Sequence, residues 1–350
     1  MKVVVVELNK YHTETFPIYE NLLPAFLQTE SVECHYYCHA DKAVELSGVY
    51  RYIAPIIGNF CYFVVRNLQL RTPFFRWKIQ RIIDKLKADV VVFNSIEPER
   101  NLNVFKGVRA KRKIAIVHNP LALSLDAKNA NEDYFVLSEI VYNKFRDELP
   151  LSGYMLPFFK PYPTEPKERG DGKIMIGVQG LVNFKRRDYD FLIELCKLLK
   201  EQKHEGVVFN IIGSNNKKGG KWLRELIAEF GLEEYFVLHE SLDDAAFFSE
   251  VEACDLLMPL LGPKQRHYFE DKTTATFSHA AAYNKPMLLS RENAEAWGLD
   301  DLKQYIYEDV ETCAAVLQHL YNLESHKAKF AQWTALRLKE NLKLLEEKNQ

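Results

Sequence analysis

The chain has 350 residues, of which 47% are hydrophobic and 27% charged, and its formal net charge is −2. These values indicate a globular protein with enough residues for two ordinary domains, and the near-neutral charge argues against a nucleic-acid partner. Six cysteines without a dense framework indicate reduced thiols, as in the cytoplasm.

Apolar segments alternate with amphipathic ones through the first half of the chain. We expect strands at residues 3–7, 33–39, 88–95, 113–120 and 133–138, and helices at 16–28 and 74–87. Continuous Val and Ile runs between helices are typical of a parallel sheet that is covered on both faces.

A linker is expected after this half, because "LPFFKPYPTEPKERGDG" combines four prolines with charges and glycines. The alternation then restarts. We expect strands at 173–178, 206–213, 235–240, 255–261 and 285–290, and helices at 189–200, 221–230 (ended by Gly231), 245–253, 273–283 and 325–350.

The pattern predicts an α/β protein of two Rossmann-like, doubly wound domains that face each other across a cleft. The boundaries are an N-terminal domain at 1–160, a linker at 161–172, a second domain at 173–324 and a C-terminal helix at 325–350. Ligands of such sheets bind beyond the carboxyl ends of the strands.

Two loops of the second domain have the form of an anion site. In "GVQGLVNFKRRDYDFLI", Gly180 allows a turn, and Lys185, Arg186 and Arg187 precede a helix. Cations oppose the dipole at a helix start, so three of them there suggest a bound anion, although a solvated basic loop is the simpler alternative. In "NIIGSNNKKGG", Gly213 and Ser214 favour either a close ligand contact or a plain turn.

A third candidate is "YFEDKTTATFSHAAAYNKPMLLS". We expect Thr273 and Thr274 in the first turn of a helix, where their hydroxyl and N–H groups converge on an anion. Lys264, Arg266 and Lys272 lie nearby in the sequence. The alternative is a packed helix with a threonine cap.

No metal site is predicted. Asp188 and Asp190 form an Asp-x-Asp pattern, but at a helix start the capping interpretation is favoured. In "CHYYCHAD", an extended strand places Cys34 and Cys38 about 13 Å apart, too far for one tetrahedral site.

The order of segments from 173 to 290 resembles the donor-binding half of GT-B glycosyltransferases, especially the retaining family-4 type. The matching pieces, in order, are "GLVNFKRRDYDFLI", "VVFNIIG", "FVLHESL", "ACDLLMPL" and "DKTTATFSHAAAYNKPMLL". Their order is more specific than any single piece.

The resemblance implies a site for a nucleotide-sugar donor. The donor-binding residues that it implies are Gly180, Gly213, Ser214, Leu242, Arg266, Asp271, Lys272, Thr273, Thr274 and His279. Asp271 and His279 stand where the family has glutamates, Thr274 where it has a phosphate-contacting glycine, and Leu181 where it has an arginine. Lys185 or Arg186 would therefore neutralise the departing diphosphate.

The first domain would bind the acceptor. His118, at the end of an expected strand, is the candidate to orient the sugar or the acceptor hydroxyl, with His12 as the second candidate. A purely structural histidine is the alternative. Glu97 and Glu99 are candidate bases.

Residues 52–65 carry no charge, yet they are too few to span a bilayer. Basic and aromatic residues follow up to 81. This combination fits either peripheral contact with a membrane through residues 52–81 or a helix pair packed on the sheet.

The sequence thus predicts a hexosyltransferase-type glycosyltransferase of the retaining class in surface polysaccharide or glycoconjugate synthesis. We expect a UDP- or GDP-linked donor, a glycan or lipid-linked saccharide acceptor, no cofactor or essential metal, and a cytoplasmic location, at the inner face of the membrane if the contact exists. The alternatives are a non-catalytic GT-B subunit that supports a partner enzyme, and a sugar-nucleotide epimerase.

Overall fold

The computed structural model describes residues 1–9, 15–38, 71–97, 99–122, 129–158, 164, 172–213, 215, 217–299, 305–320 and 323–347. The chain divides into two compact units, one formed by Met1–Pro161 with Arg337–Gln350 and the other by Tyr162–Leu336. Parallel strands alternate with helices in both units. The predicted α/β class with Rossmann-like domains is therefore confirmed.

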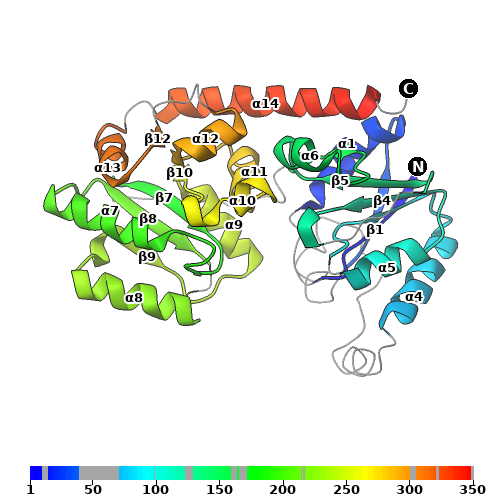
Figure 1. Cartoon of the computed structure of the whole chain (residues 1–350), viewed down its shortest axis with the longest axis horizontal. Coiled ribbons are helices and arrows are strands. Elements are labelled where there is room, and N and C mark those ends of the chain that lie inside the picture. Colours follow the sequence, from blue (N-terminus) through cyan, green and yellow to red (C-terminus); the bar gives the residue numbers. More distant parts are fainter. Residues whose placement is uncertain are drawn as a thin grey trace. The chain divides into compact units, whose positions relative to one another are not determined.

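The first unit contains a parallel sheet in the order β2-β1-β3-β4-β5-β6 (Figure 1). Its strands are β1 (Lys2–Val6), β2 (Glu33–Tyr37), β3 (Val90–Phe93), β4 (Arg112–Ile116), β5 (Glu132–Val136) and β6 (Gly153–Tyr154). Because the paired strands are parallel, their carboxyl ends lie along one edge of the sheet.

The helices described in this unit are α1 (Pro17–Leu27), α4 (Arg71–Leu86), α5 (Glu99–Gly107) and α6 (Glu139–Phe145). Figure 1 shows α4 and α5 side by side, on the other side of the sheet from α1. The right-handed crossover rule accounts for this, because the chain moves in opposite directions along the sheet after β1 and after β2. Helices α5 and α6, with nine and seven residues, were not predicted from the sequence.

The second unit contains a parallel sheet in the order β10-β7-β8-β9, and β11 with β12 forms a short parallel pair. The strands are β7 (Ile174–Gln179), β8 (Val207–Ile212), β9 (Phe236–Leu238), β10 (Leu256–Leu257), β11 (Leu289–Ser290) and β12 (Ile306–Tyr307). A bridge between Leu257 and Met287 links the two sheets.

Strands lie within the predicted ranges 255–261 and 285–290, but they are shorter than predicted, since only two residues of each form a ladder. The first ends early because Leu260 takes a left-handed backbone conformation, with φ of 53°, between two prolines at 259 and 263. The chain leaves the sheet there and continues to the short helix α10 (His267–Glu270).

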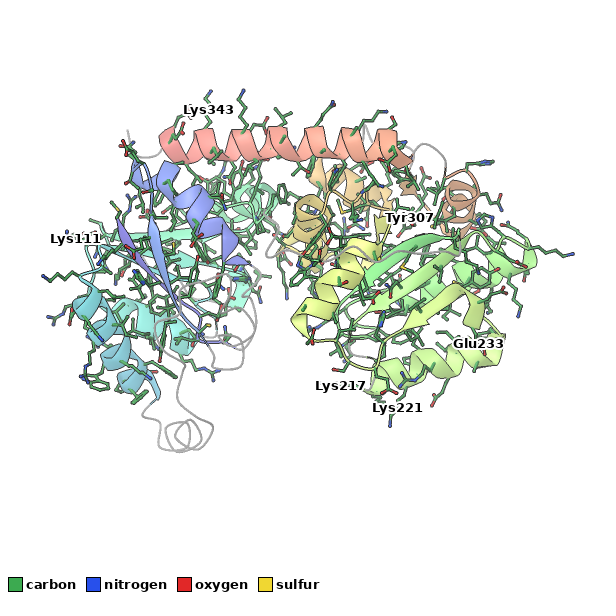
Figure 2. The ribbon with its side chains drawn as sticks, turned by 180° about the vertical axis from the view of Figure 1, so that it is seen from behind. Lys111, Lys217, Lys221, Glu233, Tyr307 and Lys343 are labelled. Carbon is green, nitrogen blue, oxygen red and sulfur yellow. The ribbon has the colours of Figure 1, made fainter. Side chains whose placement is uncertain are left out.

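The helices of the second unit are α7 (Tyr189–Glu201), α8 (Lys218–Phe230), α9 (Asp244–Ala253), α10 (His267–Glu270), α11 (Ala275–Ala282), α12 (Arg291–Trp297) and α13 (Val310–Gln318). Helix α7 packs against α8 and α13, α9 packs against β7 and β8, and α11 contacts β10. Helix α8 ends at Gly231, which is left-handed as predicted. Lys217 and Lys221 extend into solvent at its start (Figure 2).

The last helix, α14 (Leu323–Glu347), confirms the predicted C-terminal helix in outline. The helix contributes residues to both units, because the division between the two units falls after Leu336. Arg337 contacts Glu139 of the first unit, with Nη1 donating to a carboxylate oxygen at 3.0 Å. Among the helices that the structure describes, none has the length and hydrophobicity to cross a bilayer.

Candidate functional site

The loops after β7 and β8 meet backbone to backbone. Gly180 has a φ of 101°, a conformation that favours glycine. Its N–H donates to the Ile212 carbonyl at 2.8 Å. A Cβ added to Gly213 would lie only 2.2 Å from the Gly180 carbonyl oxygen. Glycine is thus required at both positions to bring the carboxyl ends of the two strands together.

A turn at Asn183 determines where the basic residues point. The Asn183 side-chain oxygen accepts the Lys185 N–H at 2.9 Å, and its carbonyl accepts the N–H groups of Arg186 and Arg187 at 2.8 and 3.0 Å. Asparagine commonly stabilises such turns through its own side chain. Lys185 and Arg186 are left exposed on the outer side of the turn, whereas Arg187 is half-buried.

Arg187 is the cation that reaches the third loop. Its Nη2 donates to Thr274 Oγ1 at 3.3 Å, its Nη1 donates to the Arg186 carbonyl at 2.9 Å, and the guanidinium lies 6.0 Å from the centre of the Tyr268 ring. Burial lowers the pKa of Arg187, but a guanidinium stays charged in proteins. Within the described part of the chain, no carboxylate forms an ion pair with it, and its Nε is buried without a hydrogen-bond partner.

The start of α11 differs from the prediction. The helix begins at Ala275, so Thr274 is the N-cap residue and Thr273 lies before the helix rather than in its first turn. Thr274 is only 4% exposed, and its hydroxyl makes no capping hydrogen bond but accepts from Arg187 and donates to Thr276 Oγ1 at 3.5 Å. Thr273 Oγ1 is buried and has no partner among the described residues. We call Gly180, Arg187, Thr273 and Thr274 the Arg187 cluster.

His279 lies on the buried side of α11, is 5% exposed, and makes T-shaped ring contacts with Phe247 and Phe248. Its Nδ1 hydrogen-bonds Gln179 Oε1 at 3.1 Å. This contact makes the Nδ1–H form the consistent tautomer, because an amide oxygen only accepts. Gln179 ends β7, and its Nε2 is buried with no partner in the described structure. Sequence reasoning missed Gln179, since a glutamine at a strand end carries no motif.

The structure does not bring Arg266 to the cluster. Its guanidinium pairs with Glu270 at 3.0 Å and with Glu292 at 3.5 Å. Lys272 lies nearer, with Nζ 5.1 Å from the centre of the Tyr268 ring that also faces Arg187.

The other implied donor residues stay predictions. Asp271 ends α10, where its N–H bonds the His267 carbonyl at 3.3 Å. Leu242 is half-buried after β9. Ser214 lies outside the described residues.

Asp188 caps α7, as the capping interpretation predicted. Its carboxylate accepts the Phe191 N–H at 3.3 Å, and its own N–H donates to the Leu260 carbonyl at 2.9 Å. Asp190, two residues further along the chain, is exposed. Among the residues described, no three His, Cys, Asp or Glu side chains come together as metal ligands.

His118 follows β4 in the first unit, at the carboxyl edge of that sheet. Its Nε2 bonds the Asn94 carbonyl at 2.8 Å, a contact that orients the ring. Glu97 accepts the Asn119 N–H at 2.6 Å, and Glu99 is exposed at the start of α5. A catalytic role for any of these three stays a prediction, and His12 lies outside the described residues.

The same edge holds a buried polar network. Glu7 is fully buried, and its carboxylate accepts from the Asn9 N–H and from Asn94 Nδ2, both at 2.6 Å. Asn94 Oδ1 in turn accepts from the Thr15 hydroxyl at 2.5 Å and from Tyr19. Satisfied networks of this kind rigidify loops, so the polar side chains at this edge are held in place.

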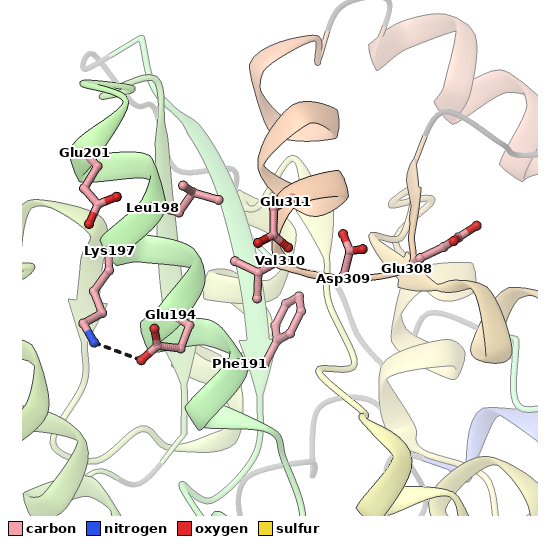
Figure 3. Close-up of a pocket in the computed structure, with 9 residues that line it drawn as sticks. All are labelled: Phe191, Glu194, Lys197, Leu198, Glu201, Glu308, Asp309, Val310 and Glu311. Atoms are coloured by element: carbon pink, nitrogen blue, oxygen red, sulfur yellow. Dashed lines mark hydrogen bonds and ion pairs between the residues drawn. The ribbon is translucent and has the colours of Figure 1, made fainter.

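An open groove of about 560 Å³ lies elsewhere in the second unit, between α7 and the start of α13 (Figure 3). Five of its nine lining residues are acidic: Glu194, Glu201, Glu308, Asp309 and Glu311. Its one cation, Lys197, is paired with Glu194 at 2.9 Å. Such a lining repels anions, so the groove does not suit a phosphate-bearing ligand.

No protein-family model and no curated protein sequence matches the chain. Solved structures match it over nearly its whole length. A glycosyltransferase from Rickettsia africae ESF-5 has a TM-score of 0.59 and 14% identity, covering 99% of this chain and 96% of that one. Anabaena Alr3699/HepE, solved with UDP and glucose, has a TM-score of 0.60 and 10% identity, covering 99% and 97%.

A putative UDP-N-acetylglucosamine 2-epimerase from Listeria monocytogenes is also similar, with a TM-score of 0.57 and 12% identity over 98% of this chain and 95% of that one. At these identities the similarities show the fold, and they confirm the predicted GT-B class. The likeness to the retaining family-4 type stays a prediction.

Proposed function

We propose that the chain is a glycosyltransferase that uses a nucleotide-sugar donor and binds the donor's diphosphate at the Arg187 cluster. The observation that carries this proposal is the Arg187 guanidinium, which points at Thr274 and has no carboxylate partner among the described residues. A half-buried charge without an ion-pair partner is stabilised by a counter-charge, and the planar guanidinium fork matches phosphate oxygens.

Two further buried donors of the second unit support an anionic ligand. Thr273 Oγ1 and Gln179 Nε2 are buried donors without partners in the described structure, and they come from two further segments of the same unit. Unsatisfied buried donors are costly, so a ligand with several acceptor oxygens would stabilise them. A diphosphate supplies such oxygens.

The chemistry follows from the charge. During transfer, the bond between the sugar's anomeric carbon and the diphosphate oxygen breaks, and its electron pair stays on the diphosphate. The acceptor hydroxyl oxygen forms the new bond to that carbon and loses its proton. Arg187 would stabilise the growing negative charge, which lowers the barrier if the contact is stronger in the transition state than in the bound donor.

We assign the positive charge at the diphosphate to Arg187 rather than to a divalent metal, and we place Lys185 and Arg186 outside the contact because both are exposed. Transfer of a hexose with retention, with the departing phosphate taking the acceptor's proton, rests on the family resemblance. So do a UDP- or GDP-linked donor and a glycan or lipid-linked saccharide acceptor.

Titration calorimetry with UDP, GDP and CMP tests the donor site. We expect one of the two nucleoside diphosphates to bind. Arg187→Ala should weaken that binding by about 10- to 150-fold, because a hydrogen bond to a charged group contributes roughly 1.5–3 kcal/mol. Arg186→Ala is the matched control and should stay within about threefold of the wild type.

Two outcomes would contradict the assignment: no nucleoside diphosphate binds, or Arg187→Ala binds it as tightly as the wild type. Product analysis then separates the functions that one fold supports. Sugar transfer to an acceptor supports the proposal. Binding without transfer or hydrolysis favours a non-catalytic subunit, and conversion of the donor to an isomer of equal mass favours an epimerase.

A further inference from the structure

Helix α4 concentrates positive charge on an otherwise acidic chain. Residues 71–87 contain six basic side chains and one acidic side chain, a net charge of +5, whereas the whole chain carries −2. The helix buries Phe75, Ile79 and Ile83 in the first unit, so apolar contacts determine which of its faces is exposed. Arg81 and Lys85 lie on the exposed side, one turn apart.

Trp77 lies on this exposed side and is 57% solvent-accessible. The Arg81 guanidinium lies 5.7 Å from its ring centre, and the Phe74 ring centre lies 6.2 Å away. An exposed tryptophan among arginines has an apolar body and a polar N–H, the combination that is enriched where a protein meets the headgroup region of a membrane.

The basic surface continues onto the end of α5, beside α4 in Figure 1. The Arg76 side chain lies against Gly107, where an added Cβ would come within 2.6 Å of it. Gln80 bonds the Arg109 main chain twice, accepting its N–H at 2.6 Å and donating to its carbonyl at 3.1 Å. The exposed side chains of Lys106 and Arg109 therefore extend the surface. We call it the α4 surface, formed by Arg76, Trp77, Arg81, Lys85, Lys106 and Arg109.

We propose that the α4 surface binds the headgroup region of an anionic lipid bilayer. Its cations match lipid phosphates, and Trp77 matches the boundary between headgroups and acyl chains. A nucleic acid offers phosphates too, but the exposed Trp77, whose ring matches the headgroup boundary, favours the membrane. Residues 52–70 of the segment suspected from the sequence lie outside the described residues, so the surface is defined by α4 and α5 alone. The inference does not depend on the proposed transferase activity.

Co-sedimentation of the full chain with lipid vesicles tests the proposal. We expect binding to vesicles of phosphatidylcholine with one quarter phosphatidylglycerol, and at least tenfold weaker binding to pure phosphatidylcholine. Raising NaCl from 50 to 500 mM should release the protein, because salt screens the attraction. Each unit of charge near an anionic membrane changes binding by about fivefold. Arg81→Glu with Lys85→Glu, a change of four units, should therefore weaken binding by at least about a hundredfold.

A matched control is Lys339→Glu with Lys343→Glu, which makes the same charge change with the same spacing on α14, where both side chains are exposed. It should change binding by less than about fivefold. The depth of Trp77 is read by fluorescence quenching with brominated lipid. Trp77→Phe should abolish the quenching, whereas Trp222→Phe, at another exposed tryptophan, should preserve it.

The proposal would be overturned by equal binding to both kinds of vesicle, by binding to neither, or by unchanged binding of the Arg81→Glu/Lys85→Glu variant. Quenching that persists in Trp77→Phe would equally contradict it. A fluorescent single-stranded DNA 20-mer is included at the same salt. Binding of the DNA but not of the vesicles would replace the membrane with a nucleic acid as the partner.

Discussion

At the residue scale, three neighbouring cations have the same chemistry and different surroundings. Lys185 and Arg186 stand exposed outside the Asn183 turn, whereas Arg187 turns inward and meets Thr274. The run of charges could be recognised in the sequence as an anion signal. Which of the three cations faces Thr274 could not be predicted from the sequence, because it depends on a turn whose hydrogen bonds involve main-chain atoms.

Gly213 offers a test at this scale, since an added Cβ would lie 2.2 Å from the Gly180 carbonyl oxygen. We expect Gly213→Ala to force the two loops apart, to destabilise the second unit by about 1–3 kcal/mol and to weaken nucleotide binding. Thermal unfolding and calorimetry measure the two effects. Gly206→Ala is the matched control, because its Cβ would meet only the His204 ring at 3.4 Å or more. Equal behaviour of the two variants would argue against the close loop contact.

At the element scale, the pairing of β4 with β5 contains a buried ion pair. Lys113 and Glu132 are 4% and 2% exposed, and Lys113 Nζ lies 2.6 Å from a Glu132 carboxylate oxygen. Burial tends to raise the pKa of Glu132, but its hydrogen bonds with Lys113 and Asn129 prevail, so the pKa is lowered overall. Removing one partner would leave an uncompensated buried charge.

Lys113→Met should therefore destabilise the first unit by about 3–5 kcal/mol. Lys113→Met combined with Glu132→Gln should recover most of the loss, because no charge is left buried and the glutamine can still accept from the Asn129 N–H. Amide hydrogen exchange of β4 and β5, followed by mass spectrometry, measures the effect in this unit. A double variant as unstable as the single one would contradict the charge argument.

The stability of the wild type and that of the Lys113→Met variant should depend on pH with opposite signs. In the wild type, Glu132 has a lowered pKa, so its contribution is present above the unfolded pKa of about 4.3 and is lost as the pH falls through the folded value. In Lys113→Met, burial without the cation raises that pKa, so acidification relieves the penalty. Exchange rates compared between pH 7 and pH 4 should therefore converge. A gap between the two proteins that widens on acidification would refute this.

At the scale of the whole molecule, the end of the chain completes the first unit. Asn341 is fully buried on α14, where Nδ2 donates to the Tyr154 carbonyl at 2.8 Å and Oδ1 accepts the Leu156 N–H at 3.0 Å. One side chain thus satisfies the backbone on both sides of Met155, more than 180 positions earlier in the sequence.

Asn341→Ala should leave two buried main-chain groups unsatisfied, at a cost of about 1–3 kcal/mol for each group. We expect faster amide exchange at residues 153–158, read by mass spectrometry. Lys343→Ala is the control, because this side chain points outward from α14 (Figure 2). Equal protection in both variants would mean that the amide contacts do not hold this segment.

The alternation of apolar and amphipathic segments by itself determined the α/β class, the parallel sheets and most element positions, because strand and helix periodicities are local properties. The capping role of Asp188 and the end of α8 at Gly231 also followed from local chemistry. The short helices α5, α6, α10, α12 and α13 escaped prediction, since each has too few turns for its periodicity to stand out. The lengths of β10 and β11 were overestimated, and β10 ends early because Leu260 turns the chain out of the sheet.

Only the tertiary structure decided which polar groups share a site. In the fold, Arg187 rather than Lys185 or Arg186 lies beside Thr274. Arg266 forms ion pairs with Glu270 and Glu292. His279 hydrogen-bonds Gln179, which is 100 positions away in the sequence. These contacts join segments far apart in the chain. Their geometry depends on how the strands are ordered and how closely the loops pack, and neither is a property of a local stretch of sequence.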